Sequence, residues 1–186
     1  CCGAAGCEPP GEKAESRWHI MFKQFFSRSA NTDSDSSLAV AITNGTLIPM
    51  NQIPDPVFAQ GILGNCIGID PDDGFIYAPA DGIISNIADS LHAIGLTCDN
   101  GLELLIHLGI DTVKLNGSTF QCFTKTGKHV KRGQKLMRMD LMQIRDAGYS
   151  PLAITCILNA SDFPDAHFTE KTHTRTGDPM ILKSDI

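Results

Sequence analysis

Two histidines are the residues of this sequence whose type and spacing best suit chemistry. His92 and His107 each lie in or beside an apolar run, and the turn-forming Asp99-Asn100-Gly101 stands almost midway between them. A β-hairpin closed at that turn pairs the two histidines and places both imidazoles on one face. An imidazole with a pKa of about 6.5 is mostly neutral at cytoplasmic pH, and its lone pair can act as a nucleophile or bind a metal. The spacing alone leaves both chemistries open.

The elements that must position this pair have the pattern of short strands. Glycine and proline fall mainly in turn sequences such as Asn44-Gly45 and Asn116-Gly117, and these residue types mark turns. Short runs rich in β-branched and apolar residues lie between the turns, at residues 38–43, 66–69, 83–88, 93–98, 102–108, 152–158 and 180–183. This pattern predicts an all-β fold, an antiparallel sandwich or barrel, with a short helix between Asp140 and Gly148. The long helical patterns of a parallel α/β fold are absent.

A separate tail is predicted ahead of this domain. We expect residues 1–37 to form a disordered tail with an amphipathic helix at about 18–28 and a polar tether at 31–37, and the domain to span 38–186. The apolar face of the helix consists of Trp18, Met21, Phe22, Phe25 and Phe26. Aromatic anchors with basic flanks favour binding at a membrane surface, and packing of this face on the domain is the alternative.

Composition excludes several classes of function. A chain of 186 residues favours one domain plus a tail. Its net charge of −6, without a long basic block, argues against nucleic-acid binding. No apolar run reaches the roughly 18 residues of a membrane span. Seven scattered cysteines without a CxxC pair indicate free thiols in a reducing cytoplasm rather than a disulfide framework or a zinc knuckle.

Several motifs, taken together and in order, resemble a known family. They are Gly64-Asn-Cys-Ile-Gly-Ile-Asp-Pro71, Ala78-Pro-Ala-Asp-Gly82, His92-Ala-Ile-Gly95, Leu105-Ile-His-Leu-Gly-Ile-Asp111 and Val130-Lys-Arg-Gly133. The combination resembles the glucose-type enzyme IIA (EIIA) of the bacterial phosphoenolpyruvate-dependent sugar phosphotransferase system, from about residue 44 to residue 183. The resemblance implies a β-sandwich whose shallow depression holds two histidines. It further implies a phosphotransferase that accepts a phosphoryl group from the histidine-containing phosphocarrier protein HPr and passes it to an enzyme IIB (EIIB) domain.

The resemblance also assigns expected roles to individual residues. His107 is expected to carry the phosphoryl group, and His92 is expected to be its partner. Ser90 stands where the family usually has Thr and keeps a hydroxyl that could bond a ring nitrogen, while Asp111 matches the acid that follows the phosphorylated histidine. An apolar rim on which carrier proteins dock is expected to consist of Val57, Phe58, Ile62, Leu63 and Leu105.

The expected reaction is an in-line transfer between imidazoles, which needs no metal or organic cofactor. His107 Nε2 is the predicted nucleophile, and a backbone carbonyl is predicted to hold its Nδ1–H. Two alternatives remain open at this point. One is a regulatory module whose phosphorylation switches binding to permeases or metabolic enzymes. The other is a zinc site at a partner interface, formed by His92, His107 and a partner's carboxylate. For each of these functions we expect a cytoplasmic protein. If the tail binds to the membrane, we expect the protein to be peripheral at the inner face of the cell membrane.

Overall fold

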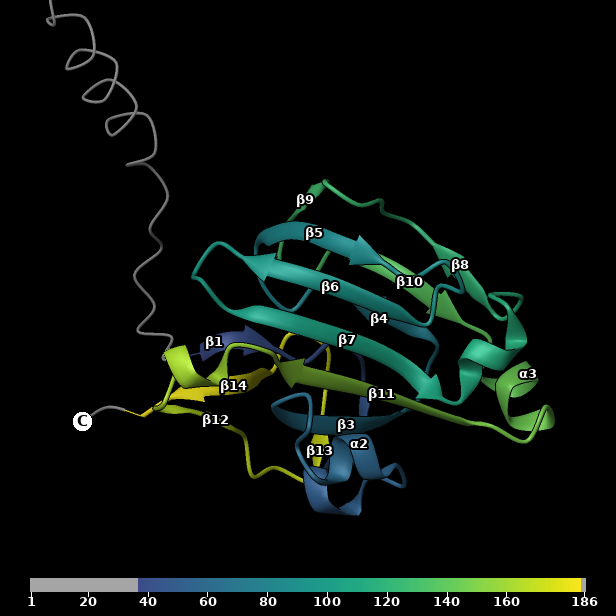
Figure 1. Cartoon of the computed structure of the whole chain (residues 1–186), viewed down its shortest axis with the longest axis horizontal. Coiled ribbons are helices and arrows are strands. Elements are labelled where there is room, and N and C mark those ends of the chain that lie inside the picture. The colour runs from purple at the N-terminus through teal and green to yellow at the C-terminus, as the bar shows by residue number, and fades with distance from the viewer. Residues whose placement is uncertain (1–36, 185–186) are drawn as a thin grey trace, which may run out of the picture. The chain divides into compact units, whose positions relative to one another are not determined.

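The computed structural model describes residues 37–184, which form three antiparallel sheets (Figure 1). The large sheet has eight strands in the order β13 (His173–Thr174), β2 (Gly45–Pro49), β3 (Asn65–Pro71), β11 (Ser150–Ile157), β7 (Glu103–Ile110), β6 (Ala93–Cys98), β5 (Gly82–Ile87) and β9 (His129–Val130). A three-stranded sheet has the order β1 (Ser37–Val40), β14 (Pro179–Lys183) and β12 (Ala166–Phe168). A second three-stranded sheet has the order β4 (Phe75–Tyr77), β10 (Lys135–Met139) and β8 (Phe120–Cys122). The predicted all-β antiparallel sandwich is confirmed.

Each of the seven predicted runs contains a strand, but the other seven strands of the described residues were not predicted: β2, β4, β8, β9, β10, β12 and β13. In β10 the burial alternates irregularly because Lys135 and Arg138 face solvent while Leu136, Met137 and Met139 are buried. Two charged residues and two methionines hide this strand from a search for β-branched runs. The strand β2 ends at Pro49, a residue that weakens a strand pattern.

The alternation of β7 separates the main core from the site. Leu104, Ile106 and Leu108 are at most 1% exposed and belong to the main apolar core. Leu105 and His107 lie between them in sequence and therefore point to the other face of the strand. On that face Leu105 packs against a second, smaller apolar cluster that includes Phe58, Ile154 and other buried residues. His107 thus lies on a strand anchored by its neighbours while its own ring stays outside the main core.

The described helices are short. The helix α2 (Pro56–Ala59) follows the 3₁₀ turn η1 (Met50–Gln52), and α3 (Leu141–Asp146) lies in the predicted segment, with Asp140 accepting a hydrogen bond from the backbone N–H of Gln143 at 3.0 Å. Further 3₁₀ turns are η2 (Thr112–Leu115) and η3 (Ala160–Asp162). Among residues 37–184, no helix is long and apolar enough to cross a membrane. The helix predicted at 18–28 lies outside the described residues.

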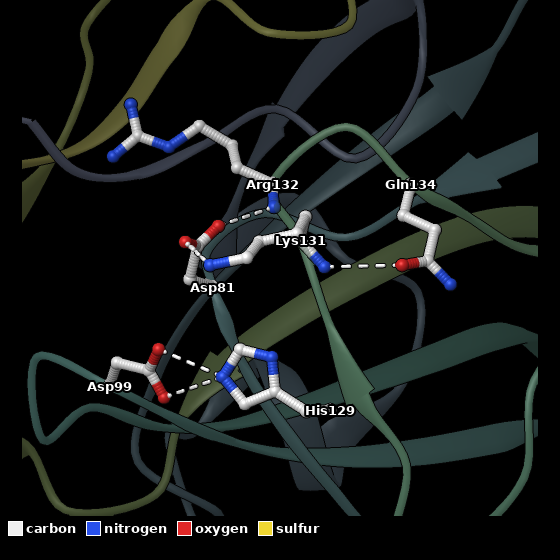
Figure 2. Close-up of polar contacts among 6 residues, drawn as sticks. All are labelled: Asp81, Asp99, His129, Lys131, Arg132 and Gln134. Carbon is white, nitrogen blue, oxygen red and sulfur yellow. Dashed lines mark hydrogen bonds and ion pairs between the residues drawn. The ribbon is translucent and has the colours of Figure 1, made fainter. Parts of the chain in front are cut away.

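A polar cluster ties the short edge strand β9 to the rest of the large sheet (Figure 2). The Asp81 carboxylate accepts hydrogen bonds from Lys131 Nζ and from the backbone N–H of Arg132, both at 2.7 Å. These bonds lower the pKa of Asp81. His129 Nε2 lies 2.9 Å from a carboxylate oxygen of Asp99 in the β6–β7 turn. His129 therefore has a structural partner away from the β6–β7 histidine pair.

Candidate functional site: two facing histidines beside an apolar helix

The predicted hairpin between β6 and β7 is present, but its register differs by one residue from the prediction. Ala93, not His92, is the direct partner of His107, and the Leu108 N–H donates to the His92 carbonyl at 2.7 Å. The reason is the turn: Cys98 pairs with Leu102, so three residues form the loop, with Gly101 in the left-handed region at φ +92°. The predicted direct pairing of the two histidines is therefore wrong.

The two imidazoles nevertheless meet. Their ring centroids are 5.1 Å apart, with the ring planes at 81° to one another. In a regular strand, His92 would face away from His107, because neighbouring residues alternate between faces. The strand β6 begins only at Ala93, and Leu91 adopts the left-handed conformation at φ 58°. This local turn, rather than strand register, lets the His92 ring face His107.

Ser90 holds His92 as its sequence position suggested. The Ser90 hydroxyl oxygen lies 2.6 Å from His92 Nδ1. This contact occupies one ring nitrogen and leaves Nε2 for another group. Burial lowers the pKa of His92, so the ring is neutral at neutral pH.

His107 is the more deeply buried ring of the pair. Burial and the neighbouring charge of His92 lower its pKa to about 4, while the Asp55 carboxylate and the Gly109 backbone act weakly in the opposite direction. The Phe58 ring packs edge-on against His107, with centroids 5.0 Å apart and planes at 60°. The result is an uncharged imidazole at neutral pH.

The nitrogen Nδ1 of His107 is buried and has no partner with strict hydrogen-bond geometry among the described residues. The Gly109 backbone nevertheless interacts with this ring and raises its pKa, so a backbone carbonyl that holds Nδ1–H stays a prediction. Packing against Phe58 also helps to fix the ring. Since Nδ1 is buried, Nε2 is the nitrogen left for a reacting group.

The segment that contains α2 supplies the exposed apolar surface. Val57, Ile62 and Leu63 are 39%, 65% and 37% exposed, and Leu105 on β7 is partly buried. Phe58 was expected on the same rim, but it is only 5% exposed. A helix of one turn can present only part of its residues outward, and Phe58 lies on its inner side. It supports His107 rather than offering a docking surface.

Asp111 lies beyond the end of β7 and does not join the histidine pair. It adopts the left-handed conformation at φ 61° as the residue preceding η2, and its carboxylate is 3.3 Å from Lys114 Nζ. The observed contact is local. Its expected interaction with a basic partner remains a prediction.

Sequence reasoning missed the helix α2 although a signal for it was present. Asp55-Pro56 has the pattern of a helix start, with an acceptor at the N-cap and proline in the first position. The Asp55 carboxylate accepts a hydrogen bond from the Val57 N–H at 2.8 Å, as that pattern requires. The left-handed Leu91 carries no comparable signal, because leucine rarely adopts positive φ.

The site offers few metal ligands. Within residues 37–184 no group of three or more histidine, cysteine, aspartate or glutamate side chains is placed to hold a metal ion. His92 and His107 together supply two nitrogens. A tetrahedral zinc ion at this pair needs further ligands from another molecule.

Comparison with known proteins agrees with this architecture. A family model described as "phosphoenolpyruvate-dependent sugar phosphotransferase system, EIIA 1" matches residues 38–163. The PTS system glucose-specific EIIA component of Staphylococcus epidermidis is 33% identical over 162 residues, which cover 87% of this chain and 97% of that protein. The EIICBA component of Staphylococcus saprophyticus is 49% identical over 141 residues, 75% of this chain and 20% of that much longer protein.

A solved structure agrees as well. The glucose permease IIA from Mycoplasma capricolum superposes with a TM-score of 0.73 at 27% sequence identity, covering 77% of this chain and 93% of that one. The sandwich, the order of its motifs and the paired histidines thus occur together with a family match over most of the described residues. The chain belongs to the EIIA 1 family of the phosphoenolpyruvate-dependent sugar phosphotransferase system.

Proposed function

We propose that His107 is the residue on which this EIIA phosphocarrier holds its phosphoryl group, received from HPr and passed to an EIIB domain. The observation that carries the proposal is the partly buried, uncharged His107 ring with a second imidazole 5.1 Å away. A neutral imidazole keeps a lone pair for attack on phosphorus, whereas a protonated one has none. The low pKa therefore keeps the nucleophile active through the neutral range.

The proposed transfer step forms a bond from phosphorus to His107 Nε2 as the bond to the donor imidazole breaks. Catalysis of such a step rests on positioning and on stabilising the charge of the transferring group. If the Ser90 hydroxyl donates to His92 Nδ1, the hydrogen of that neutral ring lies on Nε2. His92 can then donate this hydrogen to a phosphoryl oxygen.

The exposed apolar residues Val57, Ile62 and Leu63 are the proposed docking surface for both carriers. A carrier must bind, react and leave quickly, which suits a small apolar patch rather than a large interface. Asp111 and Lys114 form an exposed ion pair after β7, and we assign Asp111 to local structure with a secondary role toward a basic partner.

Incubation of the chain with phosphoenolpyruvate, enzyme I and HPr tests the assignment. Acid-labile phosphate should map to the peptide containing His107, and His107→Ala should abolish the label. His129→Ala is the matched control, because His129 is bonded to Asp99 away from this pair and its loss should leave labelling unchanged. Persistent labelling of His107→Ala would refute the proposal.

The exposed patch also favours a second, regulatory function of the same site. A phosphoryl group on His107 adds negative charge beside apolar residues and should weaken binding of a permease or metabolic enzyme that docks there. Zinc binding by His92 and His107, completed by a partner's carboxylate, is a further proposal for such a complex. Transfer itself is proposed to need no cofactor and to take place in the cytoplasm.

A further inference from the structure

We infer that Cys66 and Cys156 are a dithiol modification site, which a peroxide converts to a cross-strand disulfide. The two residues are direct partners in the antiparallel pairing of β3 with β11. Directly opposed residues share a face and have Cα atoms about 4.5 to 5.5 Å apart, which lies within the range that disulfides span. Both thiols are free.

The contacts of the two thiols distinguish them from the other described cysteines. Cys66 Sγ donates a hydrogen bond to the Phe58 carbonyl at 3.5 Å, and the Cys66 and Cys156 thiols interact closely enough to shift each other's pKa. The partner of Cys98 in β5 is Gly82, and that of Cys122 in β10 is Met137. Of the cysteines in residues 37–184, only the Cys66 and Cys156 pair is therefore in register for a disulfide.

The interaction between the two thiols shifts their pKa values in opposite directions. It lowers the pKa of Cys66, against the effect of burial, and together with burial raises that of Cys156. The direction of these shifts agrees with Cys66 as the first nucleophile, because thiolates are the nucleophiles of thiol oxidation. Burial and the nearby charge of Asp99 raise the pKa of the Cys98 thiol to about 12. Cys98 is therefore a poor nucleophile.

An open cavity gives a small oxidant a route to Cys66. Cys66 is 3% exposed and Cys156 0%, yet Cys66 lies in the wall of a cavity of about 790 Å³ beside β2, with Ile48, Met50 and Phe168. Hydrogen peroxide is small and uncharged and can enter such a space. Cys156 does not line this cavity, so Cys66 is the thiol that reacts with the peroxide first.

The chemistry balances in two steps. The Cys66 thiolate attacks one peroxide oxygen, the O–O bond breaks, and the released hydroxide takes up a proton to leave as water, which gives a sulfenic acid at Cys66. The Cys156 sulfur then attacks this sulfur, the S–S bond forms, and the hydroxyl leaves with the Cys156 proton as a second water. Two thiols are oxidised as one peroxide is reduced.

A disulfide at this place would reach the histidine site through Phe58. Formation of the S–S bond removes the S–H donor of the Phe58 carbonyl, while the Phe58 ring packs on His107. Because the Phe58 carbonyl keeps its hydrogen bond from the Gly61 N–H at 2.9 Å, we expect α2 to loosen only slightly and phosphoryl acceptance to slow by about twofold, the lower end of the effect of losing one hydrogen bond. This last step rests on the proposed function of His107, whereas disulfide formation does not.

Peptide mapping of the full-length chain tests the disulfide directly. The reduced protein is treated with hydrogen peroxide, alkylated and cleaved by a protease that cuts between Cys66 and Cys98. A Cys66–Cys156 crosslink that dithiothreitol reverses is the expected product. Cys98→Ala should leave it intact, while Cys66→Ala and Cys156→Ala should each abolish it. Oxidation of Cys66 to the sulfinic acid without a crosslink, or equal crosslinking to Cys98, would overturn the inference.

The consequence for transfer is measured on the same samples. The oxidised chain should accept phosphate from HPr more slowly, and Cys156→Ala should be insensitive to the same treatment. A mapped crosslink with an unchanged rate would overturn the link to α2. If the reduced chain takes up no label at all, it is the proposed function that fails, and the mapped crosslink stands independently.

Discussion

At the residue scale, the site depends on burial and on one left-handed residue. The His92 ring is fixed by Ser90 at 2.6 Å and the His107 ring by Phe58, and each ring has a lowered pKa because it is partly withdrawn from water. Leu91 at φ 58° orients the first ring toward the second. The chemistry of the pair therefore depends on side chains that do not themselves react.

His92→Gln tests the division of roles between the two histidines. The variant should still accept phosphate on His107 but pass it to EIIB more slowly by a factor of about 10² or more, because a donor to the transferring group is lost. Rapid-quench measurement of both half-reactions decides it. An equal loss in both half-reactions would contradict a role confined to assisting transfer.

The low pKa of His107 predicts a pH-dependent stability. The unfolded chain binds a proton at His107 below pH ~6.5, whereas the folded chain does so only near pH 4. Folding stability is thus fully present above the unfolded pKa and declines as the pH falls toward 4. Between pH 7 and 4.5, urea unfolding of His107→Gln should show a decline smaller than that of the parent chain by about 2 to 3 kcal/mol. Identical declines would show that His107 does not titrate in this way.

At the element scale, the short helix α2 is the part of the site whose stability depends most on contacts with the rest of the domain. It has four residues, and its start is fixed by the Asp55 carboxylate on the Val57 N–H. Isolated helices of this length are unstable in water, so the cap and the burial of Phe58 must hold it. The order of the proposed docking surface, which consists of Val57 on α2 and of Ile62 and Leu63 just after it, therefore depends on these two contacts.

Asp55→Ala should loosen α2 without unfolding the sheets. Loss of a cap costs about 0.5 to 2 kcal/mol, which should appear as faster hydrogen exchange in residues 56–63 and weaker HPr binding. Asp55→Asn is the matched control, because its side-chain oxygen keeps the cap and only the charge is lost. If the asparagine variant behaved like the alanine variant, the charge of Asp55 rather than its hydrogen bond would be the important feature.

At the scale of the whole molecule, the sandwich is the frame that positions the site. The predicted function of the tail is a separate matter. The described residues place the site on one face of the large sheet, while the main core lies on the other face of β7. The amphipathic segment predicted at 18–28 lies outside the described residues. Binding of this segment to a membrane surface stays a prediction, which rests on its apolar residues and on the basic Lys23 and Arg28.

Vesicle sedimentation tests the tail. The full chain should pellet with anionic liposomes at low salt, and a chain that starts at Ser37 should stay in the supernatant. Binding would raise the effective concentration of the carrier near a membrane permease. Replacing Phe22 and Phe25 by serine should abolish pelleting, with Lys13→Ala as a control outside the predicted helix. If the full chain also remains in the supernatant, the apolar face serves the domain or another partner.

The amino-acid sequence by itself determined seven of the fourteen described strands, the hairpin turn and the two histidines, because turn residues and apolar runs act locally. Only the tertiary structure decided how the rings meet. A three-residue loop shifted the β6–β7 register by one, and the left-handed Leu91 brought His92 back to His107. The inward position of Phe58 and the pairing of Cys66 with Cys156 likewise depend on which strands and helices pack together. Such contacts join residues far apart in the chain, and local sequence patterns do not encode them.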